Sequence, residues 1–340
     1  MPKSPVDFVI ITPLAEERDA VLARLPGHQK LPPSPDDIRV YYAATISAVF
    51  ADGTSTDFSV IVAPLANMGH TEAANATGDA IRRWQPRYVL LVGIAGGITS
   101  AGVKLGDVLL SDQVADYELA KVTNTGPEIR WQVHRVDQRL LIAAQNFDGG
   151  NFHLTACSRP DSQRPQVHFG PICTGNKVIA DQSLAQQLQD VWKKLIGVEM
   201  EAGGVANAAS QSARQPGFFM IRGVSDLADS NKDSAEVRQW RPYACEIAAA
   251  WAIEFLKSGP VPVASVTGQP ANPMNTSASA LASSESVTPT VNSGALRIWR
   301  EKLDFFREQE AIIADSAQKF ALKKQIEEAE TKIRELGGTP

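Results

Sequence analysis

Short apolar runs alternate with segments of helical periodicity along most of the chain. The apolar runs are rich in β-branched or aromatic residues and end at glycine, proline or polar residues, which predicts strands at 6–11, 58–63, 88–92, 108–110 and 218–221. Apolar positions at helical spacing predict helices at 16–24, 71–84, 183–194, 201–212 and 242–256. This alternation of strands and helices predicts an α/β domain with many parallel strands.

The pattern changes abruptly after residue 258. Residues 259–294 are dominated by Ser, Thr, Ala, Pro, Val and Asn, with Glu285 as their only charged residue, so they cannot bury enough apolar surface to become ordered. We expect a flexible linker there, between a domain at 1–258 and a tail at 295–340. The tail carries apolar residues at helical spacing in two segments, which predicts a helical hairpin: Trp299, Leu303 and Phe306, then Leu322, Ile326, Ala329, Ile333 and Leu336.

Composition and charge narrow the range of partners. The chain has 340 residues and a formal net charge of -5, so it lacks the basic field that gathers nucleic acid. Cys157, Cys173 and Cys245 form no CxxC pair, no histidine spacing suits a metal, and the apolar run at 8–11 is too short for a signal peptide or a membrane span. We therefore expect a cytoplasmic protein with no metal, no nucleic-acid partner and no membrane segment.

Residues that follow the predicted strands are candidates for chemistry, because parallel sheets bind ligands beyond the carboxyl ends of their strands. Glu16 and Glu17 follow the first strand, in the first turn of a predicted helix, where they could simply complement the helix dipole. Residues 92–97 follow another strand and predict a glycine-rich turn. Neither segment identifies a function by itself.

Two further segments carry carboxylates in apolar surroundings. Glu199 and Glu201 alternate in an extended stretch, so both side chains should point the same way and could grip a vicinal diol such as ribose O2′ and O3′. Asp226 ends the apolar run at 218–224 and could act as a general acid. The structural alternatives are a surface pair for the glutamates and a helix cap for the aspartate.

In order and spacing, these segments resemble the nucleoside phosphorylase and nucleosidase superfamily, and within it the methylthioadenosine/S-adenosylhomocysteine nucleosidases most. The resemblance runs from about residue 6 to residue 256. Its most specific motifs are Val-Glu-Met-Glu-Ala at 198–202 and Arg-Gly-Val-Ser-Asp-Leu-Ala-Asp at 222–229. Residues 95–97, 106–108 and 174–176 support the resemblance. The resemblance implies a three-layer α/β fold with a central mixed, twisted sheet flanked by helices. It also implies an enzyme that needs no cofactor.

The resemblance assigns a role to each matching position. Glu17 matches the glutamate that activates the attacking water, and Asp226, with Ser225 beside it, matches the acid that protonates purine N7. Met200 and Glu201 match residues that hold the ribose, with Glu201 on its hydroxyl groups. The hydrogen bonds between Glu201 and these hydroxyls would strengthen as positive charge develops on the sugar. The other expected substrate-binding positions are Met68, Ile94, Ala95, Gly96, Asn176, Val178, Ile179 and Glu199.

Departures from the family pattern favour hydrolysis over phosphorolysis. Phosphorylases of this superfamily hold phosphate with arginines in the first loop and before the glycine turn, and with a hydroxyl in that turn. Here the residues before the turn include no arginine, and Ile94 stands where a hydroxyl is usual. Arg18, in the first loop, is expected to point to solvent. His70 is interpreted as a structural histidine near the cleft.

Two cations near Asp226 raise the question of the substrate's 5′ group. Lys232 and Arg241 could receive a 5′-phosphate, which would make a nucleotide the substrate. In the alternative interpretation, Lys232 balances Asp229 and Asp233 in a loop and Arg241 packs with Trp240. The aliphatic Val178 stands where the family has a base-stacking aromatic, which also points away from the usual substrate.

The tail resembles a short module appended to effector and NTPase proteins of bacterial conflict systems. Residues 295–340 could bind a protein partner or a second copy of the chain, or dock back on the domain at 1–258. Two functions stay open. The first is a hydrolase that frees a purine base, with adenine expected, in bacterial defence; a phosphate-dependent phosphorylase is its variant. The second is a nucleoside- or nucleotide-binding sensor or signalling module with weak or no catalysis. Glu17, Glu201 and Asp226 together favour an enzyme, and a homodimer is the default assembly.

Overall fold

The computed structural model describes residues 6–262, except residues 36, 125, 154, 162, 180, 181 and 233, and scattered positions between 299 and 339. The chain forms two compact units, Met1–Gly268 and Gln269–Pro340. Most of the expected linker, residues 263–294, lies outside the described residues, so the boundaries at 258 and 294 stay predictions.

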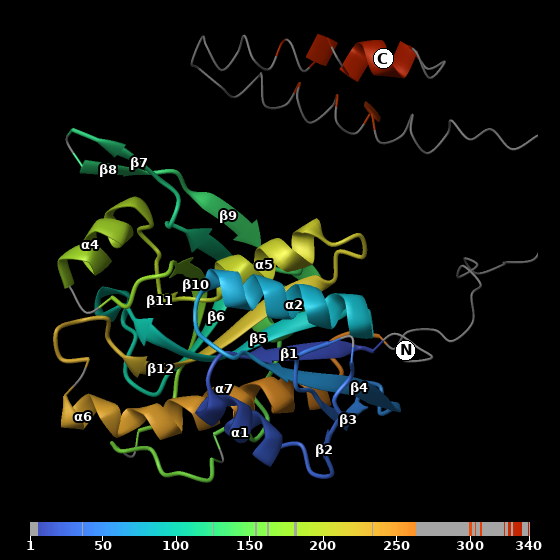
Figure 1. Cartoon of the computed structure of the whole chain (residues 1–340), viewed down its shortest axis with the longest axis vertical. Helices are drawn as coiled ribbons and strands as arrows, with labels where there is room; N and C mark the ends of the chain where they lie inside the picture. Colours follow the sequence, from blue (N-terminus) through green and yellow to red (C-terminus); the bar gives the residue numbers. More distant parts are fainter. Residues whose placement is uncertain are drawn as a thin grey trace, which may run out of the picture. The chain divides into compact units, whose positions relative to one another are not determined.

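Strands and helices alternate along the larger unit (Figure 1). Its strands are β1 (Phe8–Thr12), β2 (Gln29–Lys30), β3 (Tyr42–Val49), β4 (Ser55–Pro64), β5 (Tyr88–Gly97), β6 (Val108–Asp116), β7 (Ala120–Thr123), β8 (Gly126–Ile129), β9 (Gln132–Arg135), β10 (Val167–Thr174), β11 (Gly197–Glu199) and β12 (Gly217–Asp226). Its helices are α1 (Ala15–Ala23), α2 (His70–Trp84), α3 (Gln138–Gln145), α4 (Gln182–Val191), α5 (Ala202–Gln211), α6 (Ala235–Arg238) and α7 (Trp240–Lys257), with a 3-10 turn at Thr99–Ala101.

The large sheet is mixed and partly closes on itself. Its order is β11–β10–β6–β12–β5–β1–β4–β3–β2, with β9 paired alongside β6. Parallel pairs form its centre, whereas β3–β4, β6–β12 and β6–β9 are antiparallel. Because β11 pairs with both β10 and β5, the strands β5, β12, β6, β10 and β11 form a closed circuit. The expectation of a central mixed sheet is confirmed.

Helices cover both faces of this sheet. Helices α2 and α5 pack together on one face, and α1 and α7 pack together on the other, as Figure 1 shows. β1 is buried along its whole length and β12 along nearly all of it, as expected for strands covered on both sides. The three-layer arrangement is therefore confirmed.

The carboxyl ends of three neighbouring strands define where the site lies. β1 and β12 both run parallel to β5, one on each side of it, so all three strands end at the same edge. Glu17 follows β1, residues 94–96 belong to β5, and Asp226 is the last residue of β12. The sheet therefore brings together residues that are more than two hundred positions apart in the sequence.

The glycine-rich turn expected at 92–97 is wrong, because these residues form a strand. These residues are the second half of β5, which runs from Tyr88 to Gly97 without a break. They stay extended because each pairs with a neighbouring strand: Gly93 to Ala95 lie beside Arg222 to Val224 of β12, and Gly96 and Gly97 lie beside β11. Their lack of bulk serves close packing within the sheet rather than a turn.

The smaller unit is described only at scattered positions. The described helical residues of its first segment are Trp299, Arg300, Leu303 and Arg307. In its second segment, residues 329–334 are helical. Leu303 packs with Ala329 and Ile333, with Trp299 and Ile326 beside them. Arg307 forms an ion pair with Glu330 at 2.8 Å. These contacts between the two segments agree with the expected helical hairpin.

Candidate active site

A cavity of about 290 Å³ lies where β1, β5, β11 and β12 end, close to the lower limit of the size range of small-molecule sites. All the residues expected at the site except Asn176 line it: Glu17, Met68, Ile94, Ala95, Gly96, Val178, Ile179, Glu199, Met200, Glu201, Ser225, Asp226, Lys232 and Arg241. Pro13, Leu14, Lys177 and Val198 complete its lining. The structure therefore gathers residues from stretches of sequence between residues 13 and 241 around one space.

Glu17 joins the start of α1 to β5. Its Oε2 accepts a hydrogen bond from the Leu14 N–H at 2.6 Å, and its Oε1 accepts one from the Ile94 N–H at 2.7 Å. The side chain is buried, and burial raises the pKa of Glu17 to about 7, although Arg222 and the two N–H groups act in the opposite direction. Glu17 is therefore not a surface residue that merely complements the helix dipole, and its pKa suits proton transfer at neutral pH.

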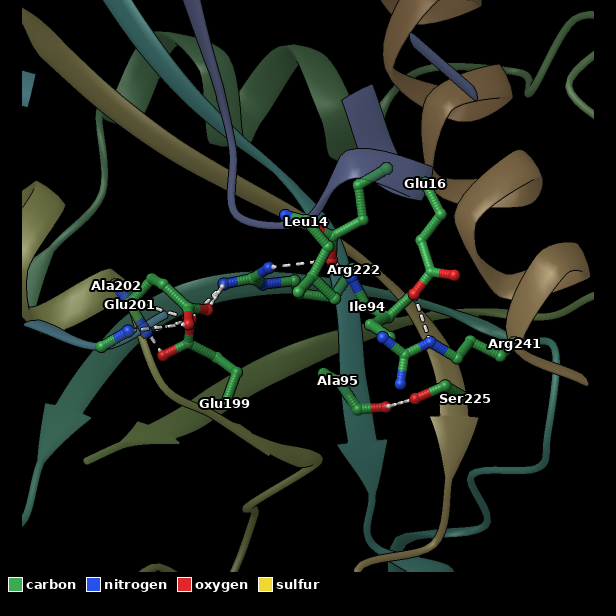
Figure 2. A network of polar contacts seen from close by, with 12 residues as sticks. Leu14, Glu16, Ile94, Ala95, Glu199, Glu201, Ala202, Arg222, Ser225 and Arg241 are labelled. Atoms are coloured by element: carbon green, nitrogen blue, oxygen red, sulfur yellow. Dashed lines mark hydrogen bonds and ion pairs between the residues drawn. The ribbon is translucent and has the colours of Figure 1, made fainter. Parts of the chain in front are cut away.

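A buried arginine holds the carboxylates of the site together, as Figure 2 shows. Arg222, in the middle of β12, donates from Nη2 to Glu199 and to Glu201, the latter at 3.1 Å, and its Nη1 lies 4.0 Å from Glu17. Both glutamates turn toward the same guanidinium, as their alternation predicts. Glu199 also accepts from the N–H groups of Glu201 and Ala202 and so caps α5.

Glu201 is the carboxylate of this group that is best placed to bind a sugar. Its Oε1 accepts a hydrogen bond from the Gly69 N–H at 3.2 Å. Burial raises the pKa of Glu201, and the neighbouring Glu199 adds to the rise, whereas Arg222 opposes it. Since Glu201 lines the cavity, a ligand hydroxyl there would meet a strong hydrogen-bond acceptor.

Three donors meet at the carboxylate of Asp226. Oδ1 accepts from the Ala228 N–H at 3.0 Å, and Oδ2 accepts from the Ser225 hydroxyl at 3.0 Å. The ammonium of Lys232 lies 3.3 Å from Oδ2. Ala228 also adopts a left-handed conformation with φ of 52°, which is uncommon for a residue with a Cβ. Asp226 does not cap a helix, because β12 is followed by an irregular segment.

The structure corrects the alternative interpretation of the two nearby cations. Lys232 contacts Asp226 rather than serving only to balance the loop acids, and Asp233 lies outside the described residues. Arg241 forms an ion pair with Glu16, which Figure 2 shows. The guanidinium that lies over the Trp240 ring, 5.2 Å from its centroid, belongs to Arg159.

The remaining expected residues lie at the rim or beside the cavity. Met68 and Val178 are about half exposed, whereas Ile179 is buried. Asn176 lies outside the lining, where its Oδ1 accepts a hydrogen bond from the His70 N–H at 2.8 Å at the start of α2. The ring of His70 lies within hydrogen-bond distance of Thr174 Oγ1, at 2.8 Å, which agrees with a structural role. Arg18, expected at the solvent, pairs with Asp19 at 2.7 Å.

Arg222 is the functional residue that sequence reasoning missed. It stood inside a matching motif but had no role assigned to it. A signal was present, since Arg222 is the only charged residue of the apolar run at 218–224, and a charge in a buried strand requires a partner. Among the residues that the structure describes, no group of three His, Cys, Asp or Glu side chains could hold a metal ion. No helix in the same part of the chain is long and apolar enough to cross a bilayer.

Carboxylates gathered around a buried arginine, at one edge of a mixed sheet, define an α/β protein whose site is equipped for acid–base chemistry. A family model described as the phosphorylase superfamily matches residues 7–257. The chain therefore belongs to the phosphorylase superfamily, as its motifs indicated. The tail lies outside the matched residues, so its resemblance to an effector-associated module stays a prediction.

Several relatives carry nucleosidase names. The chain is 29% identical to the ATP nucleosidase Cap17 of Escherichia coli over 216 residues, which cover 58% of this chain and 41% of that protein. It is 24% identical to the death domain-containing ATP nucleosidase of Amphimedon queenslandica over 200 residues, 55% of this chain and 37% of that one. It thus spans about two fifths of the length of these curated relatives. A 5'-methylthioadenosine/S-adenosylhomocysteine nucleosidase of Haemophilus influenzae is 27% identical over 215 residues, 62% and 86% of the two chains.

Solved structures agree on the fold. The methylthioadenosine/S-adenosylhomocysteine nucleosidase of Neisseria meningitidis, solved with methylthio-immucillin-A, has a TM-score of 0.57 and 22% identity, covering 74% of this chain and 98% of that one. A putative enzyme of the same name from Borrelia burgdorferi, bound to adenine, has a TM-score of 0.59 and 20% identity, covering 74% and 99%. At these identities the likeness establishes the fold alone.

Proposed function

We propose that this chain hydrolyses the N-glycosidic bond of an adenine nucleoside or nucleotide and releases free adenine. One observation carries the proposal: Glu17 lines the same cavity as Asp226, and burial raises the pKa of Glu17 to about 7. A base and an acid therefore face one space. A site that only senses a ligand needs neither group, so catalysis is favoured over binding alone.

The proposed reaction divides its proton transfers between the two carboxyl groups. Glu17 takes a proton from a water molecule whose oxygen attacks C1′ of the ribose. The C1′–N9 bond breaks, its electron pair moves into the purine, and Asp226, with Ser225 beside it, delivers a proton to N7. The products are free adenine and a ribose with a hydroxyl group at C1′. Protonation of the leaving group of this kind typically contributes about 10²–10⁴-fold to the rate.

The other lining residues would hold the substrate. Glu201 and Glu199 both contact Arg222 and line the cavity. They would accept hydrogen bonds from the ribose hydroxyls, and Met200 would lie against the sugar. The base would lie against Val178 and Ile179 and beside Ala95 and Gly96, and Met68 would line the 5′ side. These assignments follow the family motifs, and the shared cavity supports them.

Hydrolysis is favoured over phosphorolysis by the charges around the attacking side of the site. A phosphate co-substrate needs a cation that can turn toward it, but Arg222 is fully buried, contacts Glu199 and Glu201 and faces Glu17. Ile94 contributes its backbone N–H to Glu17 and offers no hydroxyl. A water molecule, unlike a phosphate dianion, fits beside this set of carboxylates.

A nucleotide is the substrate class that the outer cations support. Lys232 and Arg241 both line the cavity, and each is paired with a carboxylate that a 5′-phosphate could replace. Two relatives of 24% and 29% identity are named ATP nucleosidases, which agrees with this proposal. We propose AMP or ATP, rather than methylthioadenosine, as the preferred substrate.

We further propose that the protein works in the cytoplasm as a homo-oligomer, with a dimer as the default, and that residues 295–340 bind a protein partner in a defence effector. The packing of Leu303 against Ala329 and Ile333 supports a folded tail. The relative that joins an ATP nucleosidase to a death domain shows that such catalytic units occur beside other domains.

The direct test measures release of free base from adenosine, inosine, methylthioadenosine, AMP and ATP, with and without inorganic phosphate. We expect adenine release without phosphate, and we expect Asp226→Asn and Glu17→Gln each to lower kcat/KM by about 100-fold or more. Asp19→Asn is the matched control, because its carboxylate pairs with Arg18 and does not line the cavity. No base from any substrate, or an unchanged rate in Asp226→Asn, would contradict the proposal, and a strictly phosphate-dependent rate would contradict hydrolysis.

A further inference from the structure

Lys232 contacts one of the two carboxylate oxygens of Asp226, the residue proposed as the general acid. Its ammonium lies 3.3 Å from Oδ2, and both side chains line the cavity. Asp226 is nearly buried, at 5% exposure, whereas the Lys232 side chain is 29% exposed, so the lysine approaches from the solvent side. The contact therefore lies within the cavity that a substrate would occupy.

The contact with Lys232 fills an acceptor position of Asp226 Oδ2. Oδ2 also accepts from the Ser225 hydroxyl, and Oδ1 accepts from the Ala228 N–H. An ammonium is a donor only, so it requires an oxygen that carries no proton. While Lys232 and Ser225 both contact Oδ2, this oxygen has no position from which to present a proton to a purine.

The lysine can leave without a change of the backbone. Its segment is held by the hydrogen bonds from Lys232 N–H to Asp229 C=O at 3.2 Å and from Ser234 N–H to Asn231 C=O at 2.8 Å. The side chain itself has four rotatable bonds and a compact ammonium at its end. Rotation of these bonds is enough to move the charge from Asp226 to a neighbouring anion.

A purine nucleotide brings such an anion to the correct side. In the anti conformation, the C8–N7 edge of the base faces C5′ of the ribose, so a 5′-phosphate lies on the side of N7. If N7 is near Asp226, the phosphate is within reach of a lysine that already contacts Asp226. A phosphate offers more negative charge and more acceptor oxygens than one carboxylate, and a nucleoside offers neither.

We propose that Lys232 determines specificity by holding Asp226 Oδ2 in the free protein and releasing it when the 5′-phosphate of a nucleotide binds the ammonium. The released oxygen takes a proton from solvent and passes it to purine N7. The inference rests on the proposed hydrolase function and adds its substrate class: nucleotides bind and also free the acid, whereas nucleosides leave it occupied. Lys232 is thus a positioning residue for the acid as well as a phosphate ligand.

The test compares AMP with adenosine in the full-length wild type, Lys232→Met and Lys232→Arg. Lys232→Met removes the charge but keeps an unbranched side chain of similar length. We expect its kcat/KM for AMP to fall about 10- to 100-fold through loss of a charge-assisted contact. We expect its kcat for adenosine to rise, because Asp226 is no longer occupied. Lys232→Arg should restore the preference for AMP, and Lys193→Met, at an exposed lysine paired with Asp190, controls for loss of one positive charge.

The opposite shifts for the two substrates separate this proposal from simpler ones. An equal fall for AMP and adenosine would mean that Lys232 is structural and would overturn the proposal. A rise in KM for AMP with an unchanged kcat for adenosine would mean that Lys232 only binds phosphate, which would also overturn it. Adenine release in either case leaves the hydrolase function standing. A wild type that releases adenine from neither substrate refutes both.

Discussion

The carboxyl group of Glu17 has two backbone N–H donors and faces one guanidinium, yet burial still decides its affinity for protons. Those three partners stabilise the ionised form, whereas removal from water destabilises it by more, which leaves the pKa of Glu17 at about 7. The adjacent Glu16 is exposed and pairs with Arg241. Neighbouring glutamates therefore have different chemistry, which their sequence positions alone do not reveal.

The pH dependence of the rate should report this pKa. Glu17 must be ionised to accept a proton from water, so kcat/KM should fall about tenfold for each pH unit below 7 as this carboxylate is protonated. The measurement is adenine release at saturating and limiting substrate over roughly pH 5 to 9, with circular dichroism at each pH to show that the protein stays folded. A rate that stays level down to pH 5 would exclude Glu17, at its raised pKa, as the base.

At the scale of elements, the second half of β5 shows why glycines follow this strand's apolar run. A Cβ on Gly93 would collide with the carboxylate of Glu17 and the guanidinium of Arg222. The strand has to lie this close, because its Ile94 N–H holds Glu17. The absence of a side chain at Gly93 therefore lets Glu17 and Arg222 lie beside β5 and face each other.

Substitution of Gly93 by alanine should disrupt the site more than the fold. We expect Gly93→Ala to displace Glu17 and Arg222, to cost about 1–3 kcal/mol in the free energy of unfolding and to lower kcat/KM about 100-fold. Denaturant unfolding and adenine release measure the two effects. Gly78→Ala in α2, where a Cβ meets nothing within 4 Å, is the control and should keep full activity. Full activity in Gly93→Ala would show that the contact of β5 with Glu17 is dispensable.

Strands and helices could be predicted from the sequence where the spacing of apolar residues indicates them. Apolar runs located β1, β4, β5, β6 and β12 and helical spacing located the main helices, because burial against the sheet dictates both patterns. The continuation of β5 through its glycines was not predictable, since it depends on pairing with β11 and β12, far along the chain. The same holds for Arg222, whose three carboxylate partners come from two other segments, and for Asn176, which meets His70 instead of the cavity.

At the scale of the whole molecule, the lining of the cavity comes entirely from residues 13–241 of the larger unit. Val261 is buried in the core of this unit, so the packed chain extends beyond the last helix, α7. The smaller unit has a cluster of its own around Leu303 and Ile333. Catalysis and assembly are therefore expected to reside in different parts of the chain.

Removal of the tail should separate these two properties. A chain that ends at residue 262 keeps Val261 and every lining residue, so we expect its kcat/KM for adenine release to stay within about twofold of the full chain. Light scattering of both proteins measures whether the tail contributes to assembly. Leu303→Asp in the full chain, which places a charge in the tail's cluster, should give the same kinetic result. A large loss of activity in both proteins would show that the tail takes part in the site.

The arrangement around Arg222 has a consequence for what the site selects. One positive charge faces Glu17, Glu199 and Glu201, so positive charge is in short supply at the place where the sugar would bind. A neutral ribose does not correct this imbalance, but a ribose ring that becomes cationic while its bond to the base breaks does. The protein would then recognise a short-lived charge more strongly than the shape of any stable sugar.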